Sequence, residues 1–253
     1  MDWIKKRALA GERLLGVGAM LGSSMIVELI GKTGFDWVWI DYEHGVGGTN
    51  DMLTMCQAAA IHKLPAIVRL PANDLQYHKQ ALDFGAAGVM VPYVNTAEEA
   101  AHAARCTKFS PKGLRGVAQS TRAAQFALNF AEYLDEADDN VLTIVQIETP
   151  EAVDNVDEIA AVEGVDVLFV GPLDLSVSMG IPRQFDHPDF IAALDRVLGA
   201  CKAHNKVPGI LTPTHELAEN WTKKGFAFLV VGADGTLIAR TFADLRTRWQ
   251  QVD

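Results

Sequence analysis

Several common signals are missing from this chain of 253 residues. Its three cysteines (Cys56, Cys106 and Cys201) are far apart and show no C-x-x-C spacing, which excludes a disulfide framework and suits a reducing compartment. No stretch approaches the roughly 18 apolar residues that a membrane helix needs. The first residues lack the apolar run of a signal peptide. These absences predict a cytoplasmic protein that does not enter a membrane.

Basic residues are too few and too scattered for a surface that tracks nucleic-acid phosphates. The chain has 22 Lys and Arg against 32 Asp and Glu, a formal net charge of −10, and no basic cluster. Nucleic-acid binding depends on such clusters, so no nucleic-acid partner is expected. The content of 49% hydrophobic and 21% charged residues is instead typical of a globular enzyme and excludes disorder.

What the chain does contain is a repeated short apolar run, followed by a polar turn and a helix-like segment. The runs are rich in β-branched and aromatic residues and are bounded by Gly and Pro, which favours strands. Their apolar residues stand at successive positions, as in parallel sheets that are buried on both faces. There are eight such runs: 16–20, 37–43, 65–70, 88–94, 142–148, 165–171, 207–212 and 226–232.

Segments with helical spacing separate the runs, near 24–33, 50–62, 76–85, 96–108, 150–162, 187–204 and 214–224. A last amphipathic segment carries Ile238, Phe242, Leu245 and Trp249 at three- and four-residue intervals. Eight strand–helix alternations over residues 1–253 predict a single-domain (β/α)8 TIM barrel. A doubly wound open sheet is the alternative, but GVGAMLGSS matches its glycine-rich phosphate turn poorly.

One connection, between residues 94 and 142, is longer than the others. It contains the turn SPKGLRG (110–116) and a second expected helix around 121–138. Inserts of this length on a barrel are usually functional loops, lids or contacts with partners. We expect this connection to have a role of the same kind.

Barrel enzymes place their active sites at the carboxyl ends of the strands, and polar residues of this chain gather there. The residues that end the second, third, fifth and sixth runs are Asp41, Glu43, His44, Arg69, Gln146, Glu148, Gly171, Pro172, Leu173 and Asp174. Because parallel strands of a barrel all end on the same side, these residues should surround one mouth. Packing alone does not explain so many polar tips on apolar strands.

Glu148 and Asp174 are the candidate metal ligands. Two carboxylates from adjacent strand ends, completed by water and substrate oxygens, suit Mg²⁺ or Mn²⁺. Each carboxylate can equally cap the helix that follows it or pair with a nearby base, and the spacing leaves both interpretations open. As residues of the mouth, we expect them to be solvated rather than part of the core.

His44 and Arg69 are the candidates for proton transfer and for charge stabilisation. An imidazole titrates near neutral pH, so His44 can accept and return a proton. Arg69 ends an apolar strand, and its guanidinium suits a carboxylate or a developing enolate oxygen. The alternatives are a histidine with a structural role and a salt bridge from Arg69 to Glu43 or Asp41 across the rim.

Two covalent mechanisms lack the residues that they need. No lysine ends an expected strand, so a Schiff base with the substrate is not expected and a metal ion has to act as the electron sink. The chain has no G-x-S-x-G elbow and no cysteine at a strand end beside a histidine. An activated serine or cysteine nucleophile is therefore not expected either.

Five motifs resemble those of a known family: DYEHG (41–45), VRLP (68–71), SPKGLRGV (110–117), VQIETPEA (145–152) and VGPLDLSVSMG (170–180). The chain resembles the HpcH/HpaI family of class II, metal-dependent pyruvate aldolases. More distant relatives of that family are the citrate lyase β subunits and macrophomate synthase. The resemblance runs through nearly the whole chain, from residue 16 to the last helix.

The resemblance implies a reversible retro-aldol cleavage of a 4-hydroxy-2-oxoacid to pyruvate and an aldehyde. It implies an enolate of pyruvate held on a divalent ion (Mg²⁺, Mn²⁺ or Co²⁺). Matched by motif, Glu148 and Asp174 correspond to the metal ligands. His44 corresponds to the base that takes the proton of the C4 hydroxyl, and Arg69 to the donor that stabilises the enolate oxygen.

The resemblance also implies roles for residues around these four. Gln146 and the turn 171–174, with the backbone at its last two positions, correspond to the contact with the pyruvate carboxylate. Asp83 corresponds to an aspartate that reaches a histidine of a neighbouring subunit and raises its basicity. Asp41 is placed to orient His44.

Family members are usually hexamers, built as a dimer of trimers, with the last helix exchanged between subunits. The amphipathic segment 238–249 is compatible with such an exchange. Two departures concern the aldehyde half of the site: residues 45–47 lack the usual proline and Asn or Asp, and residues 117–130 differ from the usual loop. The resemblance therefore supports the pyruvate half of the reaction better than the identity of the aldehyde.

Other functions stay open at this point. Hydroxypyruvate can replace pyruvate as the donor, because its added hydroxyl leaves the chelating oxygens unchanged. A related carbon–carbon lyase or synthase can act on oxaloacetate or on a CoA thioester, although no basic groove for the CoA 3′-phosphate is evident. A non-catalytic barrel that only binds small molecules is the alternative from another class, and the set of His44, Arg69, Glu148 and Asp174 argues against it.

Overall fold

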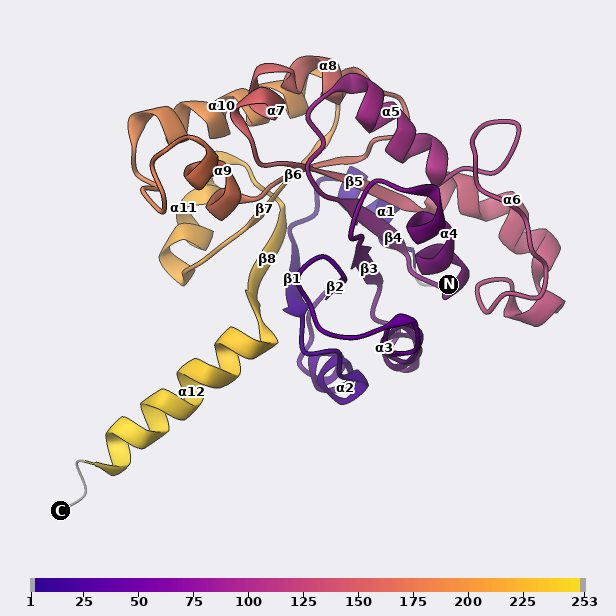
Figure 1. Cartoon of the computed structure of the whole chain (residues 1–253), viewed down its shortest axis with the longest axis horizontal. Coiled ribbons are helices and arrows are strands. Elements are labelled where there is room, and N and C mark those ends of the chain that lie inside the picture. Colours follow the sequence, from indigo (N-terminus) through magenta and orange to yellow (C-terminus); the bar gives the residue numbers. More distant parts are fainter. Residues whose placement is uncertain (1–2, 251–253) are drawn as a thin grey trace.

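The computed structural model describes residues 3–250, and its eight strands close into a barrel in sequence order (Figure 1). Every strand pairs in parallel with its neighbours, and the last pairs with the first. The strands are β1 (Leu14–Ala19), β2 (Trp37–Asp41), β3 (Ala66–Arg69), β4 (Gly88–Val91), β5 (Leu142–Ile147), β6 (Val167–Val170), β7 (Val207–Leu211) and β8 (Phe228–Ala233). The predicted TIM barrel is confirmed, and each of the eight expected runs overlaps one strand.

Helices cover the outside of the barrel and connect successive strands (Figure 1). They are α2 (Ser24–Lys32), α3 (Thr49–Ile61), α4 (Leu75–Asp83), α5 (Ala97–Cys106), α7 (Pro150–Asp154), α8 (Val156–Ala161), α10 (Pro188–Ala203) and α11 (His215–Lys224). The start of α5 shows how local sequence sets a boundary. The Thr96 hydroxyl accepts the N–H of Glu99, and the Glu99 carboxylate accepts the N–H of Thr96, which together close a capping box.

The helices differ from the sequence prediction in three places. Two short helices, α1 (Lys5–Leu9) and α9 (Pro172–Ser178), have too few turns to show a period in the sequence. The helix expected around 121–138 is shorter and begins later, as α6 (Phe130–Asn140). The turn η1 (Gln125–Ala127) precedes it, and all three of its residues have positive φ, which a right-handed helix cannot continue through.

The core has two parts, one inside the barrel and one between the strands and the surrounding helices. Trp37 and Phe228 stack inside the barrel with ring centroids 4.2 Å apart. Gly16 allows this packing, because a Cβ there would lie 2.3 Å from the Trp37 indole. Alternation along β2 turns Trp37, Trp39 and Asp41 inward, with Asp41 nearest the carboxyl end. The sequence therefore places a polar mouth directly above an aromatic floor.

The last helix, α12 (Asp234–Trp249), projects away from the barrel (Figure 1). Its predicted helical span is confirmed, but most of its large apolar side chains are not covered by the barrel. Phe242 is 66% exposed and Trp249 is 71% exposed. Within residues 3–250, none of the helices has the length and apolar character that crossing a membrane requires.

Candidate active site

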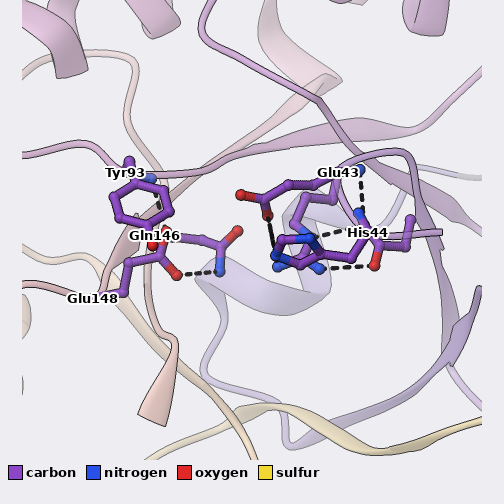
Figure 2. A network of polar contacts seen from close by, with 7 residues as sticks. Glu43, His44, Tyr93, Gln146 and Glu148 are labelled. Carbon is purple, nitrogen blue, oxygen red and sulfur yellow. Dashed lines mark hydrogen bonds and ion pairs between the residues drawn. The ribbon is translucent and has the colours of Figure 1, made fainter. Parts of the chain in front are cut away.

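The residues predicted from the strand ends converge at one mouth of the barrel. Figure 2 shows Glu43 and His44 on one side of this network, and Gln146 and Glu148 with Tyr93 on the other. Glu43 and His44 follow β2. Gln146 lies near the end of β5, and Glu148 comes directly after that strand. Topology alone brings them together, because all eight strands end on the same side of the barrel.

Arg69, the last residue of β3, is held by two carboxylates and an aromatic ring. Its Nε and Nη2 donate to the two oxygens of Asp41 at 2.8 and 2.7 Å. Its Nη1 lies 2.9 Å from Glu43 Oε2, and its guanidinium carbon lies 4.4 Å from the Trp39 ring centroid. A bidentate pair and a cation–π contact fix the plane of the guanidinium. The rim salt bridge considered from the sequence is therefore present.

His44 stands at the exposed part of the mouth. Its side chain is 61% exposed, and its Nε2 lies 3.9 Å from Glu43 Oε2. Asp41 accepts the backbone N–H of His44 at 3.4 Å and that of Glu43 at 3.0 Å. Asp41 therefore holds the turn that carries His44, while the imidazole itself is free to meet a ligand.

Glu148 is buried, so the expectation of a solvated carboxylate is wrong for this residue. It is 1% exposed, Oε1 accepts the N–H of Tyr93 at 2.8 Å, and Oε2 accepts Nε2–H of Gln146 at 3.0 Å. Burial raises the pKa of Glu148 from 4.5 to about 7, although the hydrogen bond from Tyr93 lowers it. The negative charges of Asp174 and Glu43 add to the rise.

The turn that follows the neighbouring strand β6 explains how the Glu148 carboxylate comes to lie so deep. A Cβ at Gly171 would lie 2.5 Å from Glu148 Oε2, so glycine leaves the space that the carboxylate occupies. Gln146 is 2% exposed, and its Oε1 is buried without a hydrogen-bond partner. Asp174 lies in the first turn of α9 and is half-buried. One side of the mouth thus combines two carboxylates with an unpaired buried acceptor.

This donor set fits a hard divalent cation. Such ions take carboxylate oxygens together with waters and substrate oxygens. A cation would offset the charge that burial and Asp174 make costly on Glu148, and Gln146 Oε1 is free to accept from a bound water. Among residues 3–250, no three His, Cys, Asp or Glu side chains are grouped closely enough to hold a metal by themselves. Glu148 and Asp174 would therefore share an ion with water and substrate.

Gly171→Ala is expected to lower Mg²⁺ affinity by about 10- to 100-fold, because the added methyl would displace the Glu148 carboxylate. Isothermal titration calorimetry with Mg²⁺ measures this directly. Gly199→Ala in α10 is the matched control, since a Cβ there meets nothing within 4 Å. The control should bind Mg²⁺ normally and gain up to about 1 kcal/mol of helix stability. Normal affinity in Gly171→Ala would remove Glu148 from the ligand set.

Asp83 is not brought to this mouth. It ends α4, which runs back to the amino-terminal end of the barrel, and its Oδ1 accepts from Arg115 Nη2 at 3.0 Å. Arg115 belongs to the SPKGLRG motif, is 1% exposed and lies against the rings of Phe109 and Tyr133. Within one chain Asp83 has a structural partner and does not reach His44. The role that the resemblance implies for it requires a second subunit.

Two residues of the mouth were not assigned a role from the sequence. Burial raises the pKa of Glu43, although the positive charge of Arg69 lowers it. Tyr93 follows β4 closely, has a φ of 51° and holds Glu148 through its backbone N–H. Both stand within two residues of a strand end. That position placed Glu43 at the mouth from the sequence, as a possible ion-pair partner of Arg69, and the same signal would have found Tyr93. The contact of Trp39 with Arg69 could not be predicted in this way, because Trp39 has the pattern of an ordinary buried strand residue.

Comparisons with known proteins agree with this geometry. A family model described as HpcH/HpaI aldolase/citrate lyase matches residues 20–241. The chain is 39% identical over 240 residues to the 4-hydroxy-2-oxo-heptane-1,7-dioate aldolase of Escherichia coli, covering 95% of this chain and 92% of that one. It is 38% identical over 249 residues to the 4-hydroxy-2-oxovalerate aldolase of Rhodococcus jostii, covering 98% of this chain and 96% of that one.

Solved structures give the same result. An HpcH/HpaI aldolase/citrate lyase family protein from Burkholderia cenocepacia superposes with a TM-score of 0.93 at 38% identity, over 98% of this chain and 99% of that one. The citrate lyase β subunit of M. tuberculosis, solved with oxaloacetate and magnesium, shares the fold alone. It superposes with a TM-score of 0.59 at 16% identity, over 90% of this chain and 94% of that one. This chain therefore belongs to the HpcH/HpaI aldolase/citrate lyase family and is an aldolase, a carbon–carbon lyase.

Proposed function

We propose that the protein cleaves a 4-hydroxy-2-oxoacid reversibly to pyruvate and an aldehyde at the mouth around Glu148. The observation that carries this proposal is the shared mouth itself. A deeply buried carboxylate, a guanidinium fixed by ion pairs and an exposed imidazole all lie there. The relatives at 38–39% identity bear the names of 4-hydroxy-2-oxoacid aldolases, which agrees with this class of substrate.

The proposed reaction also needs an electron sink, and the mouth offers a place for a divalent cation rather than an amine. Glu148 and Asp174 would hold Mg²⁺, Mn²⁺ or Co²⁺, and the ion would supply Lewis-acid polarisation of the oxoacid. Gln146 and the turn formed by Gly171, Pro172, Leu173 and Asp174 would contact the pyruvate carboxylate. The unpaired, buried Oε1 of Gln146 supports a ligand on this side.

In the cleavage direction the bond between C3 and C4 breaks. Its electron pair passes to C3 and into the C2 carbonyl, which gives the enolate of pyruvate. His44 accepts the proton of the C4 hydroxyl as the aldehyde carbonyl forms, which its exposed position allows. Arg69 stabilises the negative charge on the enolate oxygen, since Asp41 and Glu43 hold its guanidinium at the mouth. A proton from water then completes pyruvate at C3, and His44 returns the proton that it accepted to solvent.

A pyruvate-release assay on a panel of 4-hydroxy-2-oxoacids tests this function. The protein would be stripped with a chelator and then supplied with Mg²⁺, Mn²⁺ or Co²⁺. Release of pyruvate only with metal is the expected result, and the fastest substrate identifies the aldehyde. Release without metal would contradict the cation at Glu148 and Asp174. No pyruvate release from any of the oxoacids would contradict pyruvate as the donor. Hydroxypyruvate with aldehydes would then be tested.

We also propose that the protein works as a homohexamer, a dimer of trimers, in which another copy covers α12. The exposed Phe242 and Trp249 on a helix that leaves its own barrel support this assembly (Figure 1). A second copy would likewise provide the histidine for Asp83.

Phe242→Asp is expected to dissociate the hexamer, because it puts a charge into a surface that the assembly buries. Sedimentation velocity would show a shift to smaller species at micromolar concentration. Thr247→Asp, on the same exposed helix, is the control with one added charge and no apolar loss. A monomeric wild-type protein, or an unchanged assembly in Phe242→Asp, would contradict the covered helix.

A further inference from the structure

Tyr93 lies at the mouth and takes no part in the chemistry described above. It follows β4, and its φ of 51° is a left-handed conformation that residues with a side chain adopt rarely. Its backbone N–H donates to Glu148 Oε1 at 2.8 Å. Figure 2 shows its ring beside Glu148 and Gln146. The hydrogen bond ties the position of the ring to the bottom of the site, and such strain is typical of functional sites.

The phenol stands outside the buried groups, on the path to solvent. Tyr93 is 49% exposed, whereas Glu148 and Gln146 are 1% and 2% exposed. The backbone hydrogen bond to Glu148 places the ring on the acidic side of the mouth. A phenol ordinarily loses its proton at about pH 10, so this hydroxyl keeps its proton at neutral pH.

A substrate rich in oxygen needs hydrogen-bond donors, and the side chains lower in the mouth have few to spare. Carboxylates only accept. Gln146 Nε2 already donates to Glu148, and each guanidinium nitrogen of Arg69 lies against Asp41 or Glu43. A neutral phenol hydroxyl above these groups adds a hydrogen-bond donor to the outer part of the mouth, where His44 is the proposed proton acceptor.

We propose that Tyr93 is a specificity-determining residue whose hydroxyl donates a hydrogen bond to an oxygen on the aldehyde-derived half of the substrate. This inference rests on the proposed function. The pyruvate half belongs with the buried Glu148 and Gln146, so the half that extends past them toward solvent is the one that meets the ring.

Tyr93→Phe tests the proposal, because it keeps the ring and the backbone N–H and removes only the hydroxyl. The assays are aldol addition of pyruvate to glycolaldehyde and to acetaldehyde, which differ by one hydroxyl, and decarboxylation of oxaloacetate. We expect kcat/KM with glycolaldehyde to fall by about five- to tenfold, the worth of one neutral hydrogen bond. We expect changes below about twofold for acetaldehyde and oxaloacetate. Tyr77→Phe on α4, 39% exposed, is the control and should change none of the three.

Binding gives a second readout. The rise in melting temperature caused by pyruvate with Mg²⁺ should be the same in Tyr93→Phe and in the wild type, because the pyruvate half does not meet the hydroxyl. An unchanged preference for glycolaldehyde over acetaldehyde would overturn the proposal. Equal losses with both aldehydes and oxaloacetate would overturn it too, and would leave Tyr93 as a positioning residue for Glu148. A wild-type protein inactive with all three substrates would instead overturn the proposed function.

Discussion

Glu148→Gln is expected to lower metal-dependent pyruvate release by about 10³-fold or more, because a lost carboxylate ligand removes several kcal/mol of charge stabilisation. The fold should survive the change. The side chain keeps its length, its oxygen can accept the N–H of Tyr93, and the amide of Gln146 can turn to offer Oε1 to the new amide. Steady-state kinetics and thermal unfolding of the same preparation separate the two effects.

The pH dependence of Glu148 gives a test that needs no turnover. Its pKa is about 7 in the folded protein and 4.5 ordinarily, so folding disfavours the ionised form. The metal-free protein should therefore lose stability as pH rises from about 4.5 to 7, by about 3 kcal/mol in total. A cation has to displace the proton below pH 7, so Mg²⁺ affinity should fall about tenfold for each unit of pH below that value. Glu148→Gln should abolish both dependences.

Glu151→Gln is the matched control for both measurements, because Glu151 is exposed on α7 three residues farther along the chain. It should keep wild-type activity and the wild-type pH profile of Mg²⁺ binding. Metal-dependent turnover that persists in Glu148→Gln would exclude Glu148 as a ligand. A Mg²⁺ affinity that does not change between pH 5 and 8 would contradict the raised pKa.

Much of the fold and part of the mouth followed from local patterns. The runs that became β2 and β5 are apolar on both faces, and the barrel follows from eight such runs separated by helical segments. Because strand ends share one side of a barrel, His44, Arg69 and Glu148 could be placed at the same mouth from their sequence positions. The ion pair of Arg69 was one of the alternatives for the same reason, since Asp41 ends the neighbouring strand.

What the sequence did not provide depends on contacts between distant segments. The burial of Glu148 results from the missing side chain at Gly171, directly after the next strand, and no local pattern encodes that space. The left-handed backbone of Tyr93 is paired with a hydrogen bond to a residue 55 positions later. The late start of α6 follows from three consecutive residues of positive φ, and none of them is glycine. The course of α12 is likewise not set by its own amphipathic pattern.

His44→Ala is expected to lower the rate of retro-aldol cleavage by about 10²- to 10⁴-fold, the usual contribution of a general base. The decarboxylation of oxaloacetate should fall far less. It yields the same enolate by losing CO₂, and there is no hydroxyl proton to remove. Because the imidazole is exposed and lies beside Glu43, its removal should have little direct effect on the buried Glu148 side of the mouth. The ratio of the two rates therefore reports proton transfer specifically.

His204→Ala is the control for this ratio, because His204 ends α10 at the amino-terminal end of the barrel, away from the mouth. Both reactions should proceed normally in that variant. An equal loss of cleavage and decarboxylation in His44→Ala would assign the imidazole to the pyruvate half of the site. Cleavage at the wild-type rate would mean that another group takes the proton, and Glu43, half-buried with a raised pKa and 3.9 Å from the imidazole, would be the next carboxylate to replace.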